Sequence, residues 1–304
     1  MIRGIQSQHI GASMKHFCCN NKETNRKDSD SRVSERALRE IYLPAFEEAV
    51  KESAPRTVMC SYNKINGEYA SENRYLLTDI LRKEWGYKGC VVSDWGAVNN
   101  RVKGLQAGLD LEMPYSGGYN DRQIVKAVQE GRLDEAVLDE AVERVLNVVF
   151  AGEEQHRPED ISDKETDHKK AADIETECAV LLENNGILPL NTDRKVAYIG
   201  EFAEKPRYQG GGSSHINPFR VVSALDAAGE KGRSVTYAKG FSNENDSMTE
   251  QELEKALRTA AEADVAVIFA GLPEIFESEG YDRTSMKLPQ CQDRLIEEVL
   301  KVQP

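Results

Sequence analysis

Four segments in the first 116 residues share one pattern of apolar and polar positions. In each, a short run of apolar or β-branched residues ends in polar or charged ones and is followed by turn chemistry or a helical pattern. Such a pattern predicts a buried strand with polar groups at its end. The four segments are GASMKHFCCNN (11–21), TVMCSYNKING (57–67), GCVVSDWGAV (89–98) and AGLDLEMPYS (107–116).

Helical patterns separate these strands. Residues 33–53 carry apolar side chains at helical spacing behind Ser34, which we expect to cap the helix. Residues 72–86 repeat the pattern and stop at Gly86, as helices commonly do at glycine. Residues 121–150 predict two more helices around a turn at Gly131.

Strands that alternate with helices form parallel βα units. When each strand ends in polar residues that can bind or react, the expected architecture is a (β/α)8 barrel with its site at the carboxyl ends of the strands. Four units make only half of such a barrel, so we expect residues 1–150 to form the C-terminal half of one, with an open strand edge.

The remaining sequence predicts a second α/β domain. Residues 151–190, charged and containing Pro158, predict a linker and a leading helix over about 165–183. Residues 191–304 then alternate strands and helices, which is typical of part of an α/β/α sandwich with a parallel sheet. Its strands are expected at 195–201, 234–240 and 264–272, and its helices at 249–263 and 291–301.

Composition narrows the function classes. The net charge of -13 argues against binding nucleic acid, which requires a surplus of cations. The chain has no apolar stretch of 18 residues and no secretory signal, so we expect no membrane anchor. Six cysteines without a CxxC pair indicate reduced thiols and a cytoplasmic location. The histidines show no ligand spacing, so neither a metal nor a cofactor is expected.

Asp94 is the first candidate catalytic group, because a carboxylate at a strand end can act as a nucleophile; a capping or loop role is the alternative. Trp95 favours a sugar site, since sugars stack their C–H faces on indoles, although tryptophan is more often a core residue. Lys15 and His16 end the first strand and can donate hydrogen bonds to a ligand, or form a structural pair.

Polar residues recur at the other strand ends. Tyr62 and Asn63 end the second strand, and Asp110 and Glu112 end the fourth. Packing or capping explains each of them singly. Their recurrence at equivalent strand ends favours one shared rim that binds a ligand.

The loop PEIFESEGYDR (273–283) follows the last predicted strand, where α/β sheets place their ligands. It carries Glu277, Glu279 and Asp282. If this loop reaches Asp94, two carboxylates flank one bond, as glycoside hydrolysis requires; the alternative is a solvated acidic loop. The glycines at 210–212 lack both phosphate-binding motifs, so nucleotide binding is disfavoured.

With these motifs in order, the chain resembles glycoside hydrolase family 3, the β-glucosidase family. The resemblance implies a barrel domain joined to an α/β sandwich, with the site between the two, and a small β-glucoside as substrate. The motifs are MKHFCCNN, RALREIYLPAFE, VMCSYNKINGEYASEN, VVSDWGAV, GLDLEMP, AVLLENNGILPL, PRYQGGGSSHINP and ESEGYDR.

By this resemblance Asp94 is implied to be the nucleophile, and Trp95 a wall of the glucose subsite. Lys15, His16 and Tyr62 are implied to hold sugar hydroxyls. For the acid/base, alignment on EGYDR selects Glu279, which we prefer, whereas alignment on the acidic residue nearer the strand selects Glu277. KHFCCNN differs from the KHFPGHG of the N-acetylglucosaminidase branch, which disfavours that branch.

The early barrel strands of the family have no counterpart in this sequence, so we expect an internal fragment of a retaining β-glucosidase. Two alternatives stay open at this point. One is a catalytically dead carbohydrate-binding fragment, and the other is specificity for xylosides or arabinosides.

Overall fold

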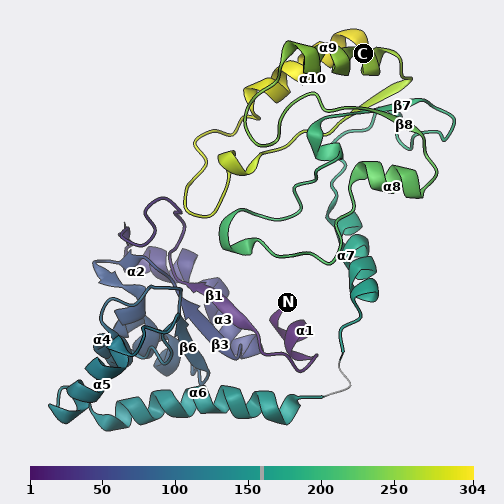
Figure 1. Cartoon of the computed structure of the whole chain (residues 1–304). Coiled ribbons are helices and arrows are strands. Elements are labelled where there is room, and N and C mark those ends of the chain that lie inside the picture. Colours follow the sequence, from purple (N-terminus) through teal and green to yellow (C-terminus); the bar gives the residue numbers. More distant parts are fainter. Residues whose placement is uncertain (158–160) are drawn as a thin grey trace. The chain divides into compact units, whose positions relative to one another are not determined.

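The computed structural model describes residues 1–157 and 161–304 and divides into two compact units, Met1–Asp160 and Ile161–Pro304 (Figure 1). Each unit is of the α/β class and has a core of its own. Pro158 of the predicted linker lies outside the described residues.

Unit 1 is built on a parallel sheet whose strands are β1 (Ser13–Phe17), β3 (Thr57–Cys60) and β6 (Cys90–Ser93), in that spatial order. The fourth predicted strand is reduced to one parallel bridge between Leu111 and Val92. All four residues of β6 are buried, as expected for a parallel strand with neighbours on both edges. The prediction of parallel βα units is therefore confirmed.

The helix expected over 33–53 is wrong as a single element. Ser34 caps its start as predicted, with its hydroxyl accepting a hydrogen bond from the Ala37 amide at 3.2 Å. Pro44 then interrupts the segment, because proline has no N–H to donate and is tolerated in the first turn of a helix. The segment forms α2 (Glu35–Ala37), the π-helical η1 (Leu38–Tyr42) and α3 (Pro44–Ser53).

The other predicted helices of unit 1 are confirmed. Gly86 has a φ of +76° directly after η3, and Gly131 a φ of +69° between two helices, which explains why these turns carry glycine. The predicted elements are η3 (Tyr75–Glu84), α5 (Tyr119–Gln129) and α6 (Glu135–Gln155), whereas α1 (Ile2–Gln6), η2 (Ala70–Glu72) and α4 (Arg101–Ala107) lie outside the predictions.

A small second sheet in unit 1 was not predicted. Its strands are two residues each: β2 (Asp30–Ser31), β4 (Lys64–Ile65) and β5 (Glu68–Tyr69). It ties the loop after β1 to the segment after β3, so residues far apart in the sequence meet at the carboxyl ends of both strands.

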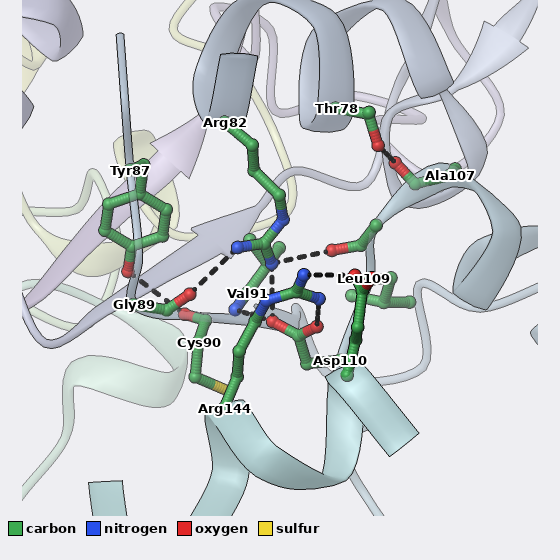
Figure 2. Close-up of polar contacts among 12 residues, drawn as sticks. Thr78, Arg82, Tyr87, Gly89, Cys90, Val91, Ala107, Leu109, Asp110 and Arg144 are labelled. Atoms are coloured by element: carbon green, nitrogen blue, oxygen red, sulfur yellow. Dashed lines mark hydrogen bonds and ion pairs between the residues drawn. The ribbon is translucent and has the colours of Figure 1, made fainter. Parts of the chain in front are cut away.

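The buried carboxylate of Asp110 joins three elements of unit 1, as Figure 2 shows. It accepts a hydrogen bond from the Val91 amide at 2.7 Å, and it pairs with Arg82 of η3 at 2.6 Å and Arg144 of α6 at 3.0 Å. Arg101 adds a bond to the Asp110 carbonyl at 2.7 Å. Burial lowers the pKa of Arg82, and the Asp110 charge opposes that shift. This network fixes the beginning of β6.

Unit 2 contains a parallel sheet of β8 (Val235–Ala238), β7 (Val196–Ile199) and β9 (Val265–Ile268), with β7 in the middle. α9 (Glu250–Ala261) packs on β7 and β8, and α10 (Gln290–Val302) packs on α9. The predicted strands and helices of this region are confirmed. Thr249 and Glu252 form a capping box at the start of α9. α8 (Ala224–Glu230) and α7 (Lys164–Cys178) are the remaining α-helices described in this unit.

The predicted helix over about 165–183 ends earlier than expected, at Cys178. No side chain of α7 is buried, so little packing holds the helix beyond its own propensity. Asn184 then forms a local turn by accepting hydrogen bonds from the Gly186 and Leu188 amides. Within residues 1–157 and 161–304, no helix has both the length and the apolar character needed to cross a bilayer.

The Asp110 network yields a prediction about stability. Asp110→Asn leaves Arg82 and Arg144 buried without their carboxylate, and breaking a buried ion pair costs about 3–5 kcal/mol. We expect the free energy of unfolding of unit 1 to fall by that amount in urea denaturation. Glu130→Gln, which removes an exposed pair with Arg132, is the matched control and should cost under about 1 kcal/mol. A loss for Asp110→Asn as small as the control's would contradict the anchoring role.

Candidate functional site

Asp94 lies directly beyond the last residue of β6, and the residue is 8% exposed. Its Oδ1 accepts a hydrogen bond from the Trp95 amide at 2.8 Å, and its carbonyl accepts one from the Ala97 amide at 3.1 Å. Gly96 has a φ of +78°, a conformation that favours glycine in this turn. The turn therefore holds one carboxylate oxygen, Oδ1, in place; the other is Oδ2.

His16 of β1 faces that other oxygen. Its Nε2 lies 3.6 Å from Asp94 Oδ2, which is too long for a hydrogen bond, and the two groups form an ion pair only when His16 is protonated. Burial lowers the pKa of His16; the Asp94 charge opposes this shift, and Lys15 and Arg26 reinforce it. His16 is therefore mainly neutral at pH 7.

The thiol beneath Asp94 is inert. Burial raises the pKa of Cys60, at the end of β3, to about 12, and a hydrogen bond from the Asp94 backbone opposes the shift. Cys60 is fully buried. It supports the Asp94 turn from the neighbouring strand as an apolar residue rather than as a nucleophile.

Trp95 and Lys15 are the exposed members of the predicted set. Trp95 is 50% exposed, although the packing interpretation expected a core residue. An exposed indole next to a buried carboxylate provides an apolar surface beside a charged group. Lys15 is exposed one residue before His16 on β1.

Tyr62 is buried and sits under cations that the sequence analysis missed. The guanidinium carbon of Arg26 lies 4.7 Å from the centre of its ring, and Lys27 Nζ lies 5.3 Å away. Arg26 also pairs with Glu23 at 3.0 Å. The signal was the dense run of charges in residues 22–32, directly after the KHF motif, which the β2–β4 pairing folds back onto Tyr62.

Asn63, Asp110 and Glu112 have structural roles. The Asn63 amide donates to the Cys19 carbonyl at 3.3 Å, and Glu112 accepts a bond from Asn120 at 2.6 Å. Asp110 lies level with Val91, near the start of β6, rather than at the end that carries Asp94. For these three residues the packing alternative holds.

In unit 2, the loop that follows β9 carries both acid/base candidates. Arg207 fastens it: its guanidinium donates to the Leu272 and Glu277 carbonyls, each at 2.8 Å. It also lies 3.4 Å from a Glu277 carboxylate oxygen. Arg207 thus holds the backbone of the loop at Glu277, whose side chain is 56% exposed.

Glu279 contacts a different partner. Its Oε2 accepts a hydrogen bond from the Ser213 amide at 2.5 Å. A Cβ added at Gly211 or Gly212 would collide with Ser278 or with Glu279 itself. The glycines therefore let the backbone approach the acidic loop closely. This packing explains the glycine run without a phosphate-binding role.

A cavity of about 600 Å³ opens within unit 2 beside this loop. His215 and Glu274 meet across it, with Nε2 and Oε2 3.4 Å apart. Its wall also contains Phe202, Tyr208, Asn243 and Tyr281. Aromatic faces with a few polar groups are the usual lining of a small-molecule site. Among the described residues, no group of His, Cys, Asp and Glu has the arrangement of a metal site.

Comparisons with known proteins match both units of the chain to the same family. Residues 1–148 match the model of the glycosyl hydrolase family 3 N-terminal domain, and residues 179–304 match the family 3 C-terminal domain. The chain is similar to a thermostable β-glucosidase B of Acetivibrio thermocellus, with 51% identity over 99% of the chain and 40% of that protein.

Two further proteins are similar to nearly the whole chain. An exo-α-(1→6)-L-arabinopyranosidase of Bifidobacterium longum is 45% identical over 98% of the chain and 41% of its own length. A crystal structure of a Bifidobacterium adolescentis GH3 β-glucosidase superposes with a TM-score of 0.94 and 44% identity, over 99% of the chain and 44% of that structure. The chain spans about two fifths of the length of the curated relatives it matches.

The His16–Asp94 pair predicts a measurable titration. Because the Asp94 charge raises the pKa of His16, Asp94→Asn should lower that pKa further below 6.5. Between the folded pKa and 6.5 the unfolded chain binds more protons, so stability falls as pH drops through this window. Histidine ring shifts recorded by NMR against pH measure the pKa in both proteins. An unchanged or higher value in Asp94→Asn would contradict the coupling.

Proposed function

Because the chain belongs to glycoside hydrolase family 3, as its ordered motifs predicted, we propose that it supplies the catalytic residues of a retaining β-glucosidase. The substrate would be a β-glucoside, cleaved at its non-reducing end to release β-D-glucose. One observation carries the proposal: a β-strand leads directly to Asp94, which has one carboxylate oxygen held by the backbone and the other facing His16, beside a half-exposed indole.

In the proposed mechanism, Asp94 attacks the anomeric carbon while a carboxylic acid protonates the leaving oxygen. A covalent glycosyl-enzyme forms, and the same residue, now a carboxylate, takes a proton from the water that resolves it. The hydrogen bond from Trp95 N–H to Oδ1 orients the nucleophile. Because His16 is mainly neutral at pH 7, it does not place a full positive charge beside the Asp94 carboxylate.

Binding of the sugar is proposed to use residues around this carboxylate. Trp95 would stack on the apolar face of the ring, and Lys15, His16 and Tyr62 would hold hydroxyls. The Arg26 guanidinium over Tyr62 and the β2–β4 pairing support the position of the Tyr62 ring.

For the acid/base we propose Glu279, with Glu277 as the alternative. Arg207 holds Glu277 through its carbonyl and lies near its carboxylate, which suits an anchoring residue. The Glu279 side chain accepts a hydrogen bond from the Ser213 amide, in the backbone of the glycine-rich loop. A bond to a backbone amide orients the carboxyl group.

We also propose the finer architecture expected from the sequence. The parallel segments β1, β3, β6 and Leu111 would be the C-terminal half of a (β/α)8 barrel, and residues 191–304 part of an α/β/α sandwich. The parallel pairing and the position of Asp94 at a carboxyl strand end support this proposal.

A second specificity has a specific observation behind it. The arabinopyranosidase of Bifidobacterium longum is 45% identical to the chain, close to the value for the β-glucosidase. Assays should therefore compare p-nitrophenyl β-D-glucoside with the α-L-arabinopyranoside, using the chain and the chain joined to the preceding family strands. Sugar binding without turnover in both would favour the alternative of a binding fragment.

For location, we propose a reducing, cytoplasmic compartment. Five of the six cysteines are buried free thiols, and Cys178 is exposed. Thiol counting on protein purified under nitrogen from its natural source should give six free thiols. A stable disulfide in that material would contradict the proposal.

The nucleophile proposal predicts the outcome of Asp94→Ala. We expect turnover to fall by more than about 10³-fold with folding unchanged, because no other group can form the glycosyl-enzyme. Azide should restore some turnover and give a glucosyl azide of inverted configuration. Glu112→Gln is the matched control and should retain activity, because the Glu112 carboxylate accepts a hydrogen bond from Asn120 and has no part in the proposed mechanism. Unchanged turnover in Asp94→Ala would reject the assignment.

The acid/base proposal predicts a dependence on the leaving group. Glu279→Gln should lose about 10²–10⁴-fold on a poor alkyl leaving group, and much less on p-nitrophenol, which leaves without protonation. Glu277→Gln in the same loop should affect both substrates alike, through loop position. The reverse pattern would move the acid/base to Glu277.

A further inference from the structure

Two adjacent cysteines follow β1 in unit 1, and the proposed mechanism does not use them. The sulfur atoms of Cys18 and Cys19 lie 3.7 Å apart. Adjacent residues of an extended chain direct their side chains to opposite faces, so neighbouring thiols do not ordinarily meet. Cys19 departs from the extended conformation with a φ of +58°, in the left-handed region that few residues other than glycine adopt.

Buried hydrogen bonds hold this unusual turn in place. The Cys18 carbonyl accepts from the Ser61 hydroxyl at 2.9 Å, and the Cys19 carbonyl accepts from the Ser31 hydroxyl at 2.9 Å. Asn63 donates to both carbonyls, at 3.4 and 3.3 Å. Three side chains thus over-determine a backbone conformation that carries a cost, and such conformations are concentrated at functional sites.

We propose that Cys18 and Cys19 form a dithiol modification site that a hydroperoxide oxidises reversibly to a disulfide between neighbouring residues. Cys18 is 0% and Cys19 6% exposed, so a small oxidant such as hydrogen peroxide can reach Cys19, and a bulky disulfide reagent cannot. The hydrogen bond between the thiols lowers the pKa of Cys19 and raises that of Cys18. Cys19 is accordingly the attacking thiolate and Cys18 the resolving thiol.

The chemistry balances in two steps. Cys19 first loses its proton, and the thiolate attacks one peroxide oxygen; the O–O bond breaks, the released hydroxide takes up that proton as water, and Cys19 becomes a sulfenic acid. Cys18 then attacks the Cys19 sulfur, the S–O bond breaks, and the departing hydroxide takes the Cys18 proton. Overall two thiols and one peroxide give one disulfide and two waters.

The product is expected to be easily reduced. Consecutive Cα atoms are about 3.8 Å apart across a trans peptide bond, whereas disulfides usually span about 4.4–6.8 Å. A ring this small is strained, and strained disulfides are the labile ones. Its closure would shift the end of β1, where His16 faces Asp94. That effect on the sugar site rests on the function proposed above, whereas the modification itself does not.

Trypsin provides a direct test, because cleavage after Lys15 and Lys22 releases HFCCNNK, residues 16–22, with both thiols in one peptide. The chain is treated with hydrogen peroxide, blocked with iodoacetamide and digested without reductant. We expect this peptide to lack both alkyl groups and to be two hydrogens lighter, and dithiothreitol before blocking should restore both alkyl groups. Peptides with Cys90 or Cys291 should stay alkylated.

Single variants separate the roles. Cys18→Ala should leave Cys19 to oxidise further, to a sulfinic acid, and Cys19→Ala should leave Cys18 alkylatable. The wild-type peptide decides the question even if a variant fails to fold. Full alkylation of HFCCNNK after peroxide, while the exposed Cys178 oxidises, would overturn the proposal, as would a disulfide from either cysteine to Cys60. Each readout is a mass, so an inactive chain does not affect it.

Discussion

A single buried carboxylate determines how unit 1 is assembled. Asp110 accepts a hydrogen bond from the β6 backbone and pairs with arginines from η3 and α6, so a strand and two helices meet at one charge. Burying a charge is unfavourable unless it is paired and hydrogen-bonded on all sides, which is the case here. The arrangement cannot be distorted without exposing or orphaning an arginine. The bond from the Val91 amide anchors β6, and Asp94 follows three residues after Val91. The position of the candidate nucleophile therefore depends on a group outside the site.

Much of the fold could be predicted because its signals are local. Apolar runs gave the parallel strands, and Gly86 and Gly131 marked helix ends through their positive φ. The predictions that failed concern helix boundaries and short strands, which depend on packing and on neighbouring residues. Pro44 begins a new helix, α3, within a continuous helical pattern. The helix after the linker ends at Cys178, because no buried side chain supports it. The two-residue strands of the small sheet are too short for any periodicity to reveal.

The candidate site divides in the same way. Asp94, Trp95 and His16 were predicted from their places at strand ends, and the structure brings His16 to the Asp94 carboxylate. Asp110 shared the same local pattern and proved to be structural, because only its long-range arginine partners distinguish it. Arg26 was missed for the converse reason: it lies in a charged loop without pattern, and distant pairing folds it onto Tyr62. The roles of the individual site residues remain predictions.

The fastening of the acidic loop in unit 2 has a consequence for engineering by homologous exchange. Arg207 donates to two carbonyls on and before the loop, and the Gly211–Gly212 backbone packs directly against Ser278 and Glu279. The two segments therefore form one interlocking module, although some 65 residues separate them in sequence. A loop transplanted from a relative into residues 273–283 brings new side chains against glycines shaped for the old ones. Chimaeras at this position need both segments from the same parent.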